Sequence, residues 1–326
     1  MRRILVTEEL HPRGMKILEN APNVEIIRLD DITPETLLGA VHNVDGIVVR
    51  SAIFTAEILS AAPNLKVVSR HGVGCDNIDV AHLSERGIPM AIAAGSNALS
   101  VAEHTLGLML ATGRDLVRQD AMVKAGGWAE RNKFRAMDLC GAKVVILGFG
   151  RVGRKVAPLC KAFGMDVVVA DIALDEALAN QMGCRGVNDF RPELANADFL
   201  TLHVPLDDST HHIVSTAELS AMKPGSIVIN CARGGVVDND ALIQSLDTGH
   251  TRAAAVDVMP IEPPAPDHPL ILRPDVIMTP HNGAAAMSAI IAMSEMSAQN
   301  ALDALDGKLS DDCTFNLSAL KKLPSH

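Results

Sequence analysis

The stretch Lys143–Asp171, KVVILGFGRVGRKVAPLCKAFGMDVVVAD, decides the fold. It opens with a short β-branched apolar run, typical of a strand covered on both faces. A glycine-rich turn, GFGRVG, comes next and leads into a helical pattern that reaches about Phe163. A second apolar strand then ends on Asp171. Strand, G-x-G-x-x-G, helix, strand and an acid about 20 residues further on form the fingerprint of a dinucleotide-binding βαβ unit.

Each glycine of this turn has a separate predicted task. Gly148 allows the tight exit from the strand, Gly150 lets a pyrophosphate approach the backbone, and Gly153 lets the helix pack closely on the strand. The helix N-terminus offers N–H groups and a partial positive charge to phosphates. Asp171 is placed to bind the adenine-side ribose, and its charge disfavours the extra phosphate of NADP. We therefore predict NAD binding; a purely structural strand–helix turn is the alternative.

The composition of the chain narrows the classes of function. Its 326 residues allow two domains, and a hydrophobic content of 48% can fill a well-covered core. The net charge of −10 and the scattered basic residues argue against a nucleic-acid surface. Apolar runs are too short for a membrane span, and Met1 leads almost directly into a strand-like segment, with no room for a signal peptide. The six scattered cysteines indicate reduced thiols and no metal site. We expect a cytoplasmic protein without membrane, nucleic-acid or metal partners.

Residues 1–99 alternate short apolar runs with helical patterns. This alternation predicts a parallel sheet covered by helices. Because the fingerprint lies beyond residue 140, we expect a separate small α/β domain here. The capping box Ser100-Val101-Ala102-Glu103 opens a long, mostly apolar helix that ends near Gly126, so the domain crossing is placed at about residue 100. The predicted strands are Ile4–Thr7, Val24–Leu29, Gly46–Val49, Lys66–Ser69 and Met90–Ala93.

Two of these predicted strands end on residues suited to binding an anion. Arg50-Ser51 follows residues 46–49, and Arg70-His71-Gly72-Val73-Gly74 follows residues 66–69. Ligands of parallel sheets bind beyond the carboxyl ends of the strands. The N–H groups of a glycine-flanked turn can also cradle a carboxylate. An ordinary polar loop with flexible glycines is the alternative.

Three polar side chains follow successive predicted strands in the second half of the chain. Arg233 comes after the run 226–231, Glu262 after 253–258, and His281 after 276–280. In a doubly wound sheet such strand ends converge on one crevice. A guanidinium can bind a substrate carboxylate, and a charged imidazole can donate a proton to a keto oxygen as hydride reaches the carbon. A carboxylate beside the imidazole stabilises its charged form and fixes its orientation. Each residue singly is compatible with a structural role, but together they predict hydride transfer to a 2-keto acid.

At these motifs the chain resembles the D-isomer-specific 2-hydroxyacid dehydrogenase family over almost its whole length. The resemblance implies two doubly wound parallel-sheet α/β domains and a cleft that closes. It makes residues 100–285 a Rossmann NAD-binding domain, inserted into a flavodoxin-like substrate-binding domain of residues 1–99 and 286–326. The segments that carry the resemblance are Gly148–Gly153 with Asp171, NCARGG at 230–235, AVDV at 255–258 with Glu262-Pro263, TPH at 279–281, GVGCDNID at 72–79 and SVAE at 100–103.

The resemblance also implies roles for individual residues. Arg233, Glu262 and His281 become the catalytic residues, and the backbone of residues 72–74 holds the substrate carboxylate. Members are usually homodimers, built partly on the long helix after Ser100. The substrate-binding set is Arg50, Ser51, His71, Gly72, Val73, Gly74 and Arg233. The cofactor-binding set is Gly148, Gly150, Arg151, Val152, Gly153, Asp171, His203, Val204, Pro205, Cys231, Ala232, Arg233, Asp257, His281 and Gly283.

The substrate within the family is less closely defined. Phosphoglycerate dehydrogenases usually carry a polar pair where Ile53-Phe54 stands here, and many have a C-terminal regulatory domain for which a chain ending at His326 leaves no room. His71 stands where small residues are common, and either adds a substrate hydrogen bond or fills the loop. We predict an NAD-dependent reductase of hydroxypyruvate or glyoxylate that acts on the D-hydroxyacid. A D-3-phosphoglycerate dehydrogenase is the alternative, and an NAD(H)-sensing, corepressor-like binding protein is the second.

Overall fold

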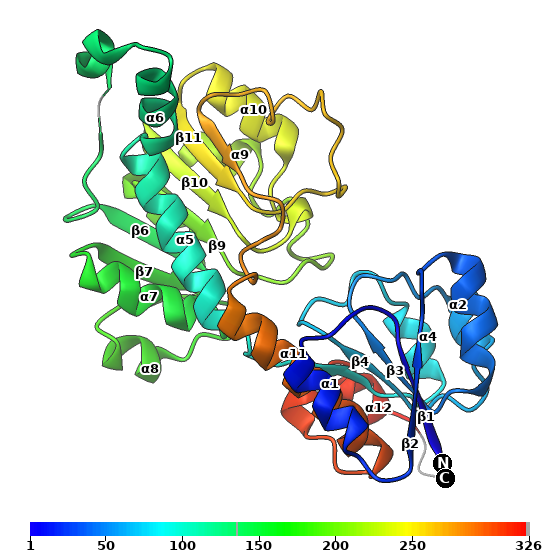
Figure 1. The fold of residues 1–326 in the computed structure, drawn as a ribbon. Helices are drawn as coiled ribbons and strands as arrows, with labels where there is room; N and C mark the ends of the chain where they lie inside the picture. Colours follow the sequence, from blue (N-terminus) through cyan, green and yellow to red (C-terminus); the bar gives the residue numbers. More distant parts are fainter. Residues whose placement is uncertain (135, 324–326) are drawn as a thin grey trace. The chain divides into compact units, whose positions relative to one another are not determined.

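The computed structural model describes residues 1–134 and 136–323, which divide into two compact units. Unit 1 combines Met1–Asn97 with Ala285–His326, and unit 2 is Ala98–Ala284. Each unit is built on a parallel sheet with helices on both faces (Figure 1). The predicted fold class of two parallel-sheet α/β domains is therefore confirmed.

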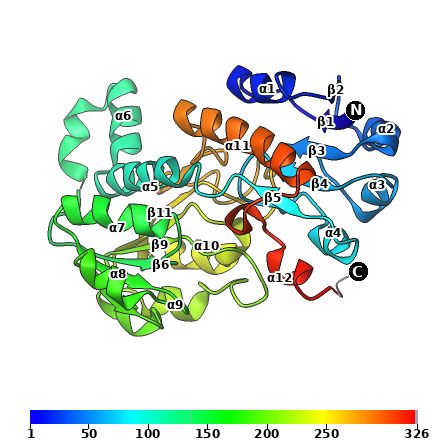
Figure 2. The same cartoon turned by 90° about the horizontal axis from the view of Figure 1, so that it is seen from below.

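The sheet of unit 1 has five parallel strands in the order β2-β1-β3-β4-β5. Alternate side chains of β1 enter cores on opposite faces, Leu5 on one and Ile4 with Val6 on the other. The core around Leu5 is closed by α2, α3 and α4, and the core around Ile4 by α1 and α11. Figure 2 shows α11 returning to this unit from the second half of the chain. The elements are β1 (Arg2–Val6), α1 (Pro12–Glu19), β2 (Val24–Arg28), α2 (Pro34–Ala40), η1 (Val41–Asn43), β3 (Gly46–Val49), α3 (Ala56–Ser60), β4 (Val67–Arg70), α4 (Val80–Glu85), β5 (Met90–Ile92), α11 (Met287–Leu305), η5 (Asp311–Cys313) and α12 (Leu317–Leu320).

The sheet of unit 2 has seven parallel strands in the order β12-β11-β10-β9-β6-β7-β8. This is the Rossmann strand order with one more strand at the edge. The order in which the chain adds strands reverses between β6 and β9, and sheets of this kind bind dinucleotides at that point. Helices α5, α7 and α8 cover one face, and α9 and α10 cover the other. The elements are α5 (Ala98–Gly113), β6 (Lys143–Leu147), α7 (Gly153–Ala162), β7 (Asp166–Ala170), α8 (Glu176–Gln181), β8 (Arg185–Val187), η3 (Arg191–Asn196), β9 (Phe199–Leu202), α9 (Thr216–Ala221), β10 (Ser226–Asn230), η4 (Gly234–Val236), α10 (Asn239–Asp247), β11 (Thr251–Val256) and β12 (Val276–Met278).

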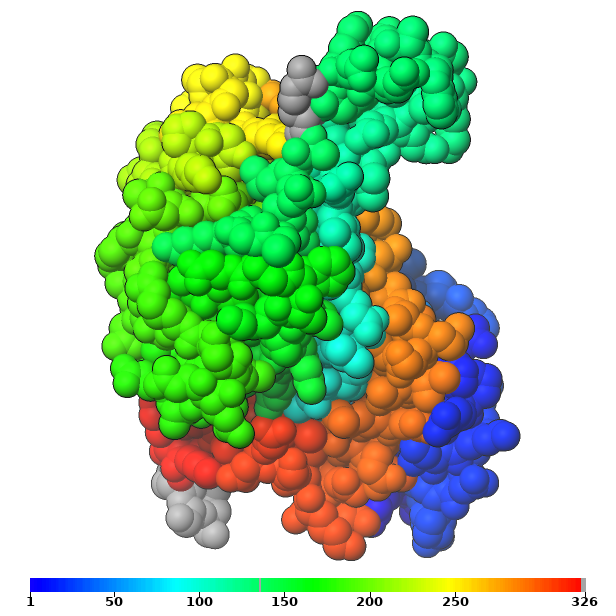
Figure 3. Space-filling view, turned by 90° about the vertical axis from the view of Figure 1, so that its left-hand side faces the viewer, coloured from blue at the N-terminus to red at the C-terminus, as the bar shows by residue number. Residues whose placement is uncertain are grey.

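The prediction of one long helix that begins after Ser100 is wrong in two respects. It begins at Ala98, so Ser100 is a buried residue of the first turn and not the cap. It also ends at Gly113, because Asp115 adopts a left-handed backbone (φ +58°) that breaks the helix. Helix α6 (Leu116–Lys124) and the 3-10 helix η2 (Trp128–Lys133) follow and bury none of their residues. Figure 3 shows this segment as a projection from unit 2.

Across the described parts of the chain, no helix has the length and apolar character that a membrane crossing requires.

Candidate active site

The three glycines of the fingerprint turn have different surroundings. Gly148 has φ +99°, and a Cβ there would lie 2.6 Å from the carbonyl oxygen of His203. A Cβ on Gly153 would lie 2.0 Å from the carbonyl oxygen of Gly148. A Cβ on Gly150 would meet no described atom within 4 Å. Gly148 and Gly153 are thus required by the fold, whereas Gly150 borders open space, which fits a pyrophosphate close to the backbone.

Asp171 directly follows β7 and is fixed to the fingerprint turn. Its Oδ2 accepts a hydrogen bond from Phe149 N–H at 2.8 Å, and its Oδ1 accepts one from Ala173 N–H at 2.9 Å. No side chain of a described residue caps the N-terminus of α7. A helix N-terminus without a side-chain cap beside an anchored carboxylate fits the phosphates and the ribose of a dinucleotide.

Two predicted cofactor-lining residues, His203 and Cys231, are neutral at ordinary pH. Burial lowers the pKa of His203 to about 3 and raises the pKa of the Cys231 thiol to about 12. Nε2 of His203 lies 3.0 Å from Thr201 Oγ1, and its Nδ1 is buried without a hydrogen-bond partner among the described residues. Neither side chain therefore carries a charge at ordinary pH, and Cys231 is not a thiolate nucleophile.

Arg233 lies just past β10 in a turn that Asn230 shapes. The Asn230 side chain donates to the carbonyl oxygen of Arg233 at 2.9 Å and accepts from Ala232 N–H at 3.0 Å. Nη1 of Arg233 donates to the carbonyl oxygen of Ala232 at 2.7 Å. A Cβ on Gly234 would lie 2.0 Å from the carbonyl carbon of Met259. Gly234 therefore lets the Arg233 turn pack against the start of the loop that carries Glu262.

His281 and Glu262 are paired, as their predicted roles require. His281 Nδ1 lies 2.8 Å from Glu262 Oε2, while Oε1 accepts a hydrogen bond from Met259 N–H at 2.8 Å. Both side chains remain accessible, with 48% of His281 and 38% of Glu262 exposed. The Glu262 carboxylate engages Nδ1 of His281. The ring nitrogen that can exchange a proton with a substrate is therefore Nε2, which bonds to no described residue.

Asp257 holds the turn that carries His281, a role that the sequence did not reveal. His281 has a left-handed backbone (φ +53°), and its N–H donates to the carbonyl oxygen of Asp257 at 2.8 Å. The next two N–H groups, of Asn282 and Gly283, donate to the Asp257 carboxylate at 2.8 and 2.9 Å. Thr279 Oγ1 donates to the same carboxylate at 2.5 Å. This carboxylate is only 3% exposed, so it acts as a buried template for a strained turn.

His104 joins this cluster from α5. Its Nε2 lies 3.1 Å from Thr279 Oγ1 and 3.5 Å from Asp257 Oδ1. A helix residue more than a hundred positions before its partners gives no sequence signal of this contact.

In unit 1, Glu8 fixes the Arg50-Ser51 turn, and the sequence did not single it out. Its carboxylate accepts hydrogen bonds from Arg50 N–H at 3.0 Å, from Ser51 N–H and Oγ, and from Thr7 Oγ1. Burial acts to raise the pKa of Glu8, but the hydrogen bonds from Ser51, Thr7 and Arg50 prevail and lower it. Glu8 therefore holds the turn as a carboxylate.

The turn 72–74 presents N–H groups at the end of β4. Neither Val73 N–H nor Gly74 N–H donates a hydrogen bond to another residue in the described ranges. The ring of His71 is buried beneath the turn, with Nε2 2.9 Å from Ser294 Oγ. Burial, and then the charge of Arg50, lower the pKa of His71 and keep it neutral. His71 thus fills the interior, and the N–H groups of Val73 and Gly74 are the donors of the candidate carboxylate cradle, by which we mean the backbone of residues 72–74.

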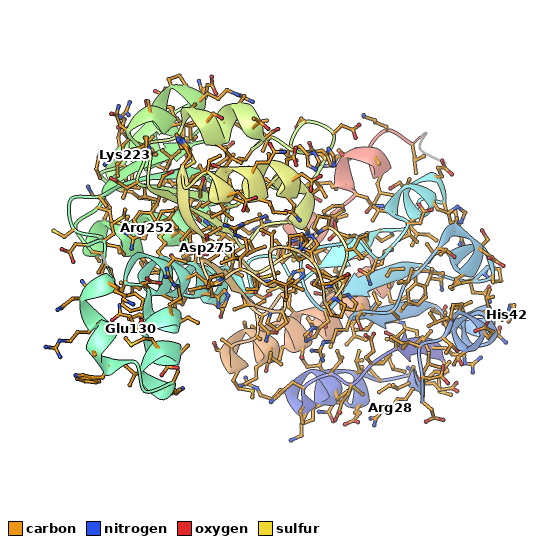
Figure 4. All side chains as sticks on the ribbon, turned by 90° about the horizontal axis from the view of Figure 1, so that it is seen from above. Arg28, His42, Glu130, Lys223, Arg252 and Asp275 are labelled. Atoms are coloured by element: carbon orange, nitrogen blue, oxygen red, sulfur yellow. The ribbon has the colours of Figure 1, made fainter. Side chains whose placement is uncertain are left out.

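Two further features of the structure involve none of the predicted catalytic, substrate-binding or cofactor-binding residues. A cavity of about 400 Å³ lies at the carboxyl ends of β1 and β2, where Arg28 (labelled in Figure 4) pairs with Glu19 at 2.7 Å. The rings of His211 and His212 stack 3.9 Å apart. No group of three His, Cys, Asp or Glu side chains in the described ranges is arranged to hold a metal ion.

Comparison with known sequences places this site in a family. Residues 106–283 match the model of the D-isomer specific 2-hydroxyacid dehydrogenase, NAD binding domain. A D-3-phosphoglycerate dehydrogenase of Methanocaldococcus jannaschii is 40% identical over 313 residues, which are 96% of this chain and 59% of that protein. One of Archaeoglobus fulgidus is 38% identical over 307 residues, 94% of this chain and 58% of that protein. The chain spans less than two thirds of the length of these relatives.

Solved structures give the same result. A D-lactate dehydrogenase from Aquifex aeolicus, complexed with NAD and lactic acid, superposes with a TM-score of 0.86 at 27% identity, covering 99% of this chain and 100% of that one. An NADPH-dependent glyoxylate/hydroxypyruvate reductase from Sinorhizobium meliloti, in complex with NADP and malonate, gives 0.82 at 29% identity, with 93% of each chain covered. The chain belongs to the D-isomer-specific 2-hydroxyacid dehydrogenase family.

Proposed function

We propose that this chain is an NAD-dependent oxidoreductase that interconverts D-3-phosphoglycerate and the corresponding phosphorylated 2-keto acid. Its relatives named D-3-phosphoglycerate dehydrogenase, at about 40% identity, favour this substrate over the hydroxypyruvate or glyoxylate that the sequence predicts first. The family match to an NAD binding domain and the neighbour complexed with NAD support the cofactor.

The observation that carries the proposal is a pair of anion-binding groups on neighbouring strand ends. β3 and β4 are hydrogen-bonded neighbours, with Val49 opposite Arg70. Arg50 follows β3, and its exposed guanidinium forms no ion pair or hydrogen bond with any described residue. The carboxylate cradle follows β4. Strands are about 4.8 Å apart, a spacing that suits two anionic groups separated by a short carbon chain. A phosphorylated hydroxyacid has two such groups, whereas hydroxypyruvate has one.

The catalytic residues then have defined tasks. In oxidation, His281 Nε2 takes the proton of the C2 hydroxyl while the hydride of C2 leaves, and in reduction the same atom returns the proton. Bound NAD supplies the acceptor and donor of that hydride. Glu262 keeps Nδ1 of His281 engaged at 2.8 Å and stabilises the imidazolium that forms. Arg233 binds the substrate carboxylate and polarises the C2 oxygen.

The cofactor residues divide according to their surroundings. Gly150 and the N-terminus of α7 receive the pyrophosphate, and Asp171 binds the adenine-side ribose. His203 and Cys231 line the wall as neutral groups. For the other predicted cofactor-binding residues, we propose the contacts with NAD that the family resemblance implies.

We also propose a homodimer that covers the projecting segment of α6 and η2. Four of its apolar side chains are highly exposed: Leu116 51%, Val117 54%, Val123 44% and Trp128 64%. Exposed apolar groups gathered on one projection are typical of an interface. Light scattering on the purified chain should give twice the monomer mass, and Val117→Glu with Trp128→Ala should give the monomer. A monomeric wild-type chain refutes this part of the proposal.

The test of the substrate is NADH oxidation with phosphohydroxypyruvate, hydroxypyruvate and glyoxylate. We expect the highest kcat/KM for the phosphorylated acid. Arg50→Gln should reduce the ratio of kcat/KM for phosphohydroxypyruvate over hydroxypyruvate by about 10- to 100-fold, since a charged hydrogen bond is worth about 1.5–3 kcal/mol. A wild-type preference for hydroxypyruvate refutes the phosphorylated substrate. Bound NADH without turnover on any acid favours the binding-protein alternative.

An unphosphorylated short keto acid is the second candidate. Ile53, close to the Arg50-Ser51 turn, is 64% exposed, and an apolar group there adds no partner for a phosphate.

A further inference from the structure

We propose that Arg70 is a positioning residue of the carboxylate cradle. Its guanidinium holds the backbone of the cradle from the protein side and places a positive charge behind it. The inference rests on the proposed function, because it assigns a cause to the shape and charge of the same substrate-binding turn. Arg70 lies at the end of β4. The sequence placed it in a segment suited to binding an anion, but the predicted substrate-binding set did not include it.

The guanidinium of Arg70 ties together the two ends of the turn. Its Nε donates to the carbonyl oxygen of Gly74 at 2.8 Å, and its Nη1 donates to the carbonyl oxygen of His71 at 2.9 Å. The planar fork of an arginine can hold two acceptors at a fixed separation, which a lysine ammonium cannot do. The side chain therefore sets the span of the turn.

The two inner carbonyl groups are also bound on the protein side. The carbonyl oxygen of Gly72 accepts from Ala93 N–H at 2.8 Å, and that of Val73 accepts from Cys75 Sγ at 3.6 Å. Together with the two Arg70 contacts, four successive carbonyl groups face inward. In a trans peptide the N–H points away from the carbonyl group of the same plane. The inward carbonyl groups therefore turn the N–H groups of Val73 and Gly74 outward.

The charge of Arg70 lies directly behind this turn. Gly72 has φ +138°, and an ideal Cβ on it would lie 3.7 Å from Nη1 and 3.8 Å from Cζ of Arg70. The guanidinium thus packs against the backbone of Gly72. Outward N–H groups backed by a cation form an anion site in which both dipoles and charge act in the same direction. In this role Arg70 acts through the backbone of the turn, to which its Nε and Nη1 are bonded.

Arg86 offers a matched control within unit 1. Its Nη1 donates to the carbonyl oxygen of Leu59, and its Nη2 donates to that of Ala62 at 2.7 Å. It is thus a second guanidinium that holds two backbone carbonyl groups, but these lie around the end of α3, not at the substrate-binding turn.

The experiment compares Arg70→Lys, Arg70→Met and Arg86→Lys in steady-state kinetics with NADH. Arg70→Lys should raise KM for the best keto acid, and the inhibition constant of oxalate, by about 10-fold or more, while kcat changes less than about threefold. Arg70→Met, which also loses the charge, should raise both constants further. The dissociation constant of NADH should not change in either variant. Arg86→Lys should lower Tm to a similar degree as Arg70→Lys and leave KM at the wild-type value.

The outcomes separate this inference from the proposed function. If the wild type turns over a keto acid but Arg70→Lys and Arg86→Lys have the same KM, Arg70 has no special role in the cradle and the inference fails alone. A fall in kcat at constant KM also refutes it, because Arg70 then acts on the chemical step. If the wild type binds NADH and turns over no keto acid, the proposed function fails, and the inference with it.

Discussion

Replacing Gly150 and Gly153 by alanine should separate cofactor binding from folding within one turn. A Cβ at position 153 would lie 2.0 Å from the carbonyl oxygen of Gly148, which is backbone and cannot move aside. Overpacking of this kind costs about 1–3 kcal/mol or more. For a domain of this size that lowers Tm by about 2–4 °C per kcal/mol, so Gly153→Ala should unfold about 2–12 °C earlier even without ligand.

Gly150→Ala should have the opposite profile. The added methyl group meets no atom within 4 Å, and the φ of Gly150 lies outside the left-handed range. An alanine in a compatible conformation stabilises a protein by about 0.4–1 kcal/mol, so Tm of the free protein should hold or rise slightly. The methyl group would instead occupy the space in which we propose that the pyrophosphate binds. Loss of a charge-assisted hydrogen bond costs about 1.5–3 kcal/mol, which weakens NADH binding by about 10- to 100-fold.

The assay is differential scanning fluorimetry with and without NADH, combined with calorimetric titration of NADH. Wild type should gain thermal stability from NADH, and Gly150→Ala should gain little at the same concentration. Equal NADH affinity in Gly150→Ala and wild type would refute the cofactor role of Gly150. A large loss of Tm in the ligand-free Gly150→Ala protein would refute the open space that the structure places beside it.

Three other substitutions test separate parts of the site. His281→Ala should lower kcat by about 10²–10⁴-fold with little change in the dissociation constant of NADH, and unchanged turnover would exclude proton transfer by His281. Asp171→Ala should reduce the ratio of kcat/KM for NADH over NADPH, and a constant ratio would assign that preference to another residue. Glu8 has a lowered pKa, so its stabilising contribution is complete above about pH 4.5 and is lost as pH falls through the folded-state value. Glu8→Gln should therefore be less stable at pH 7 by about 1–3 kcal/mol, and its Tm should fall less than that of wild type below pH 4.5; parallel curves would contradict this.

Local patterns in the sequence were sufficient for the parts of the site that depend on neighbouring residues. The apolar run before Gly148 and the one that ends at Asp171 predict β6, β7 and the turn between them. The strand ends that carry Arg233, Glu262 and His281 could be predicted for the same reason, because a parallel sheet delivers its carboxyl ends to one edge. The hydrogen bond of 2.8 Å between His281 and Glu262 agrees with that argument.

The parts that could not be predicted depend on partners far apart in the chain. Glu8 binds the N–H groups of residues 42 and 43 positions later, and His104 reaches Thr279 across 175 positions. An acidic side chain in a sequence does not show which N–H groups it will accept from. The break at Asp115 was missed for a related reason, since the apolar pattern continues through it and only the backbone conformation ends α5.

Carboxylates near strand ends have a common structural task in this fold. Glu8 accepts N–H groups from the turn after β3, Asp171 from the turn after β6, and Asp257 from the turn after β12. In each case a carboxylate beyond one strand fixes a turn beyond another, so the turns are held in place before any ligand arrives.

A turn whose N–H groups already bind an internal carboxylate has fewer donors left for a second anion. The cradle at residues 72–74 differs, because the guanidinium of Arg70 holds its carbonyl side and its N–H groups at Val73 and Gly74 bind no described carboxylate. Within unit 1, we therefore expect the substrate carboxylate to bind at the end of β4 rather than at the equally polar turn that Glu8 occupies.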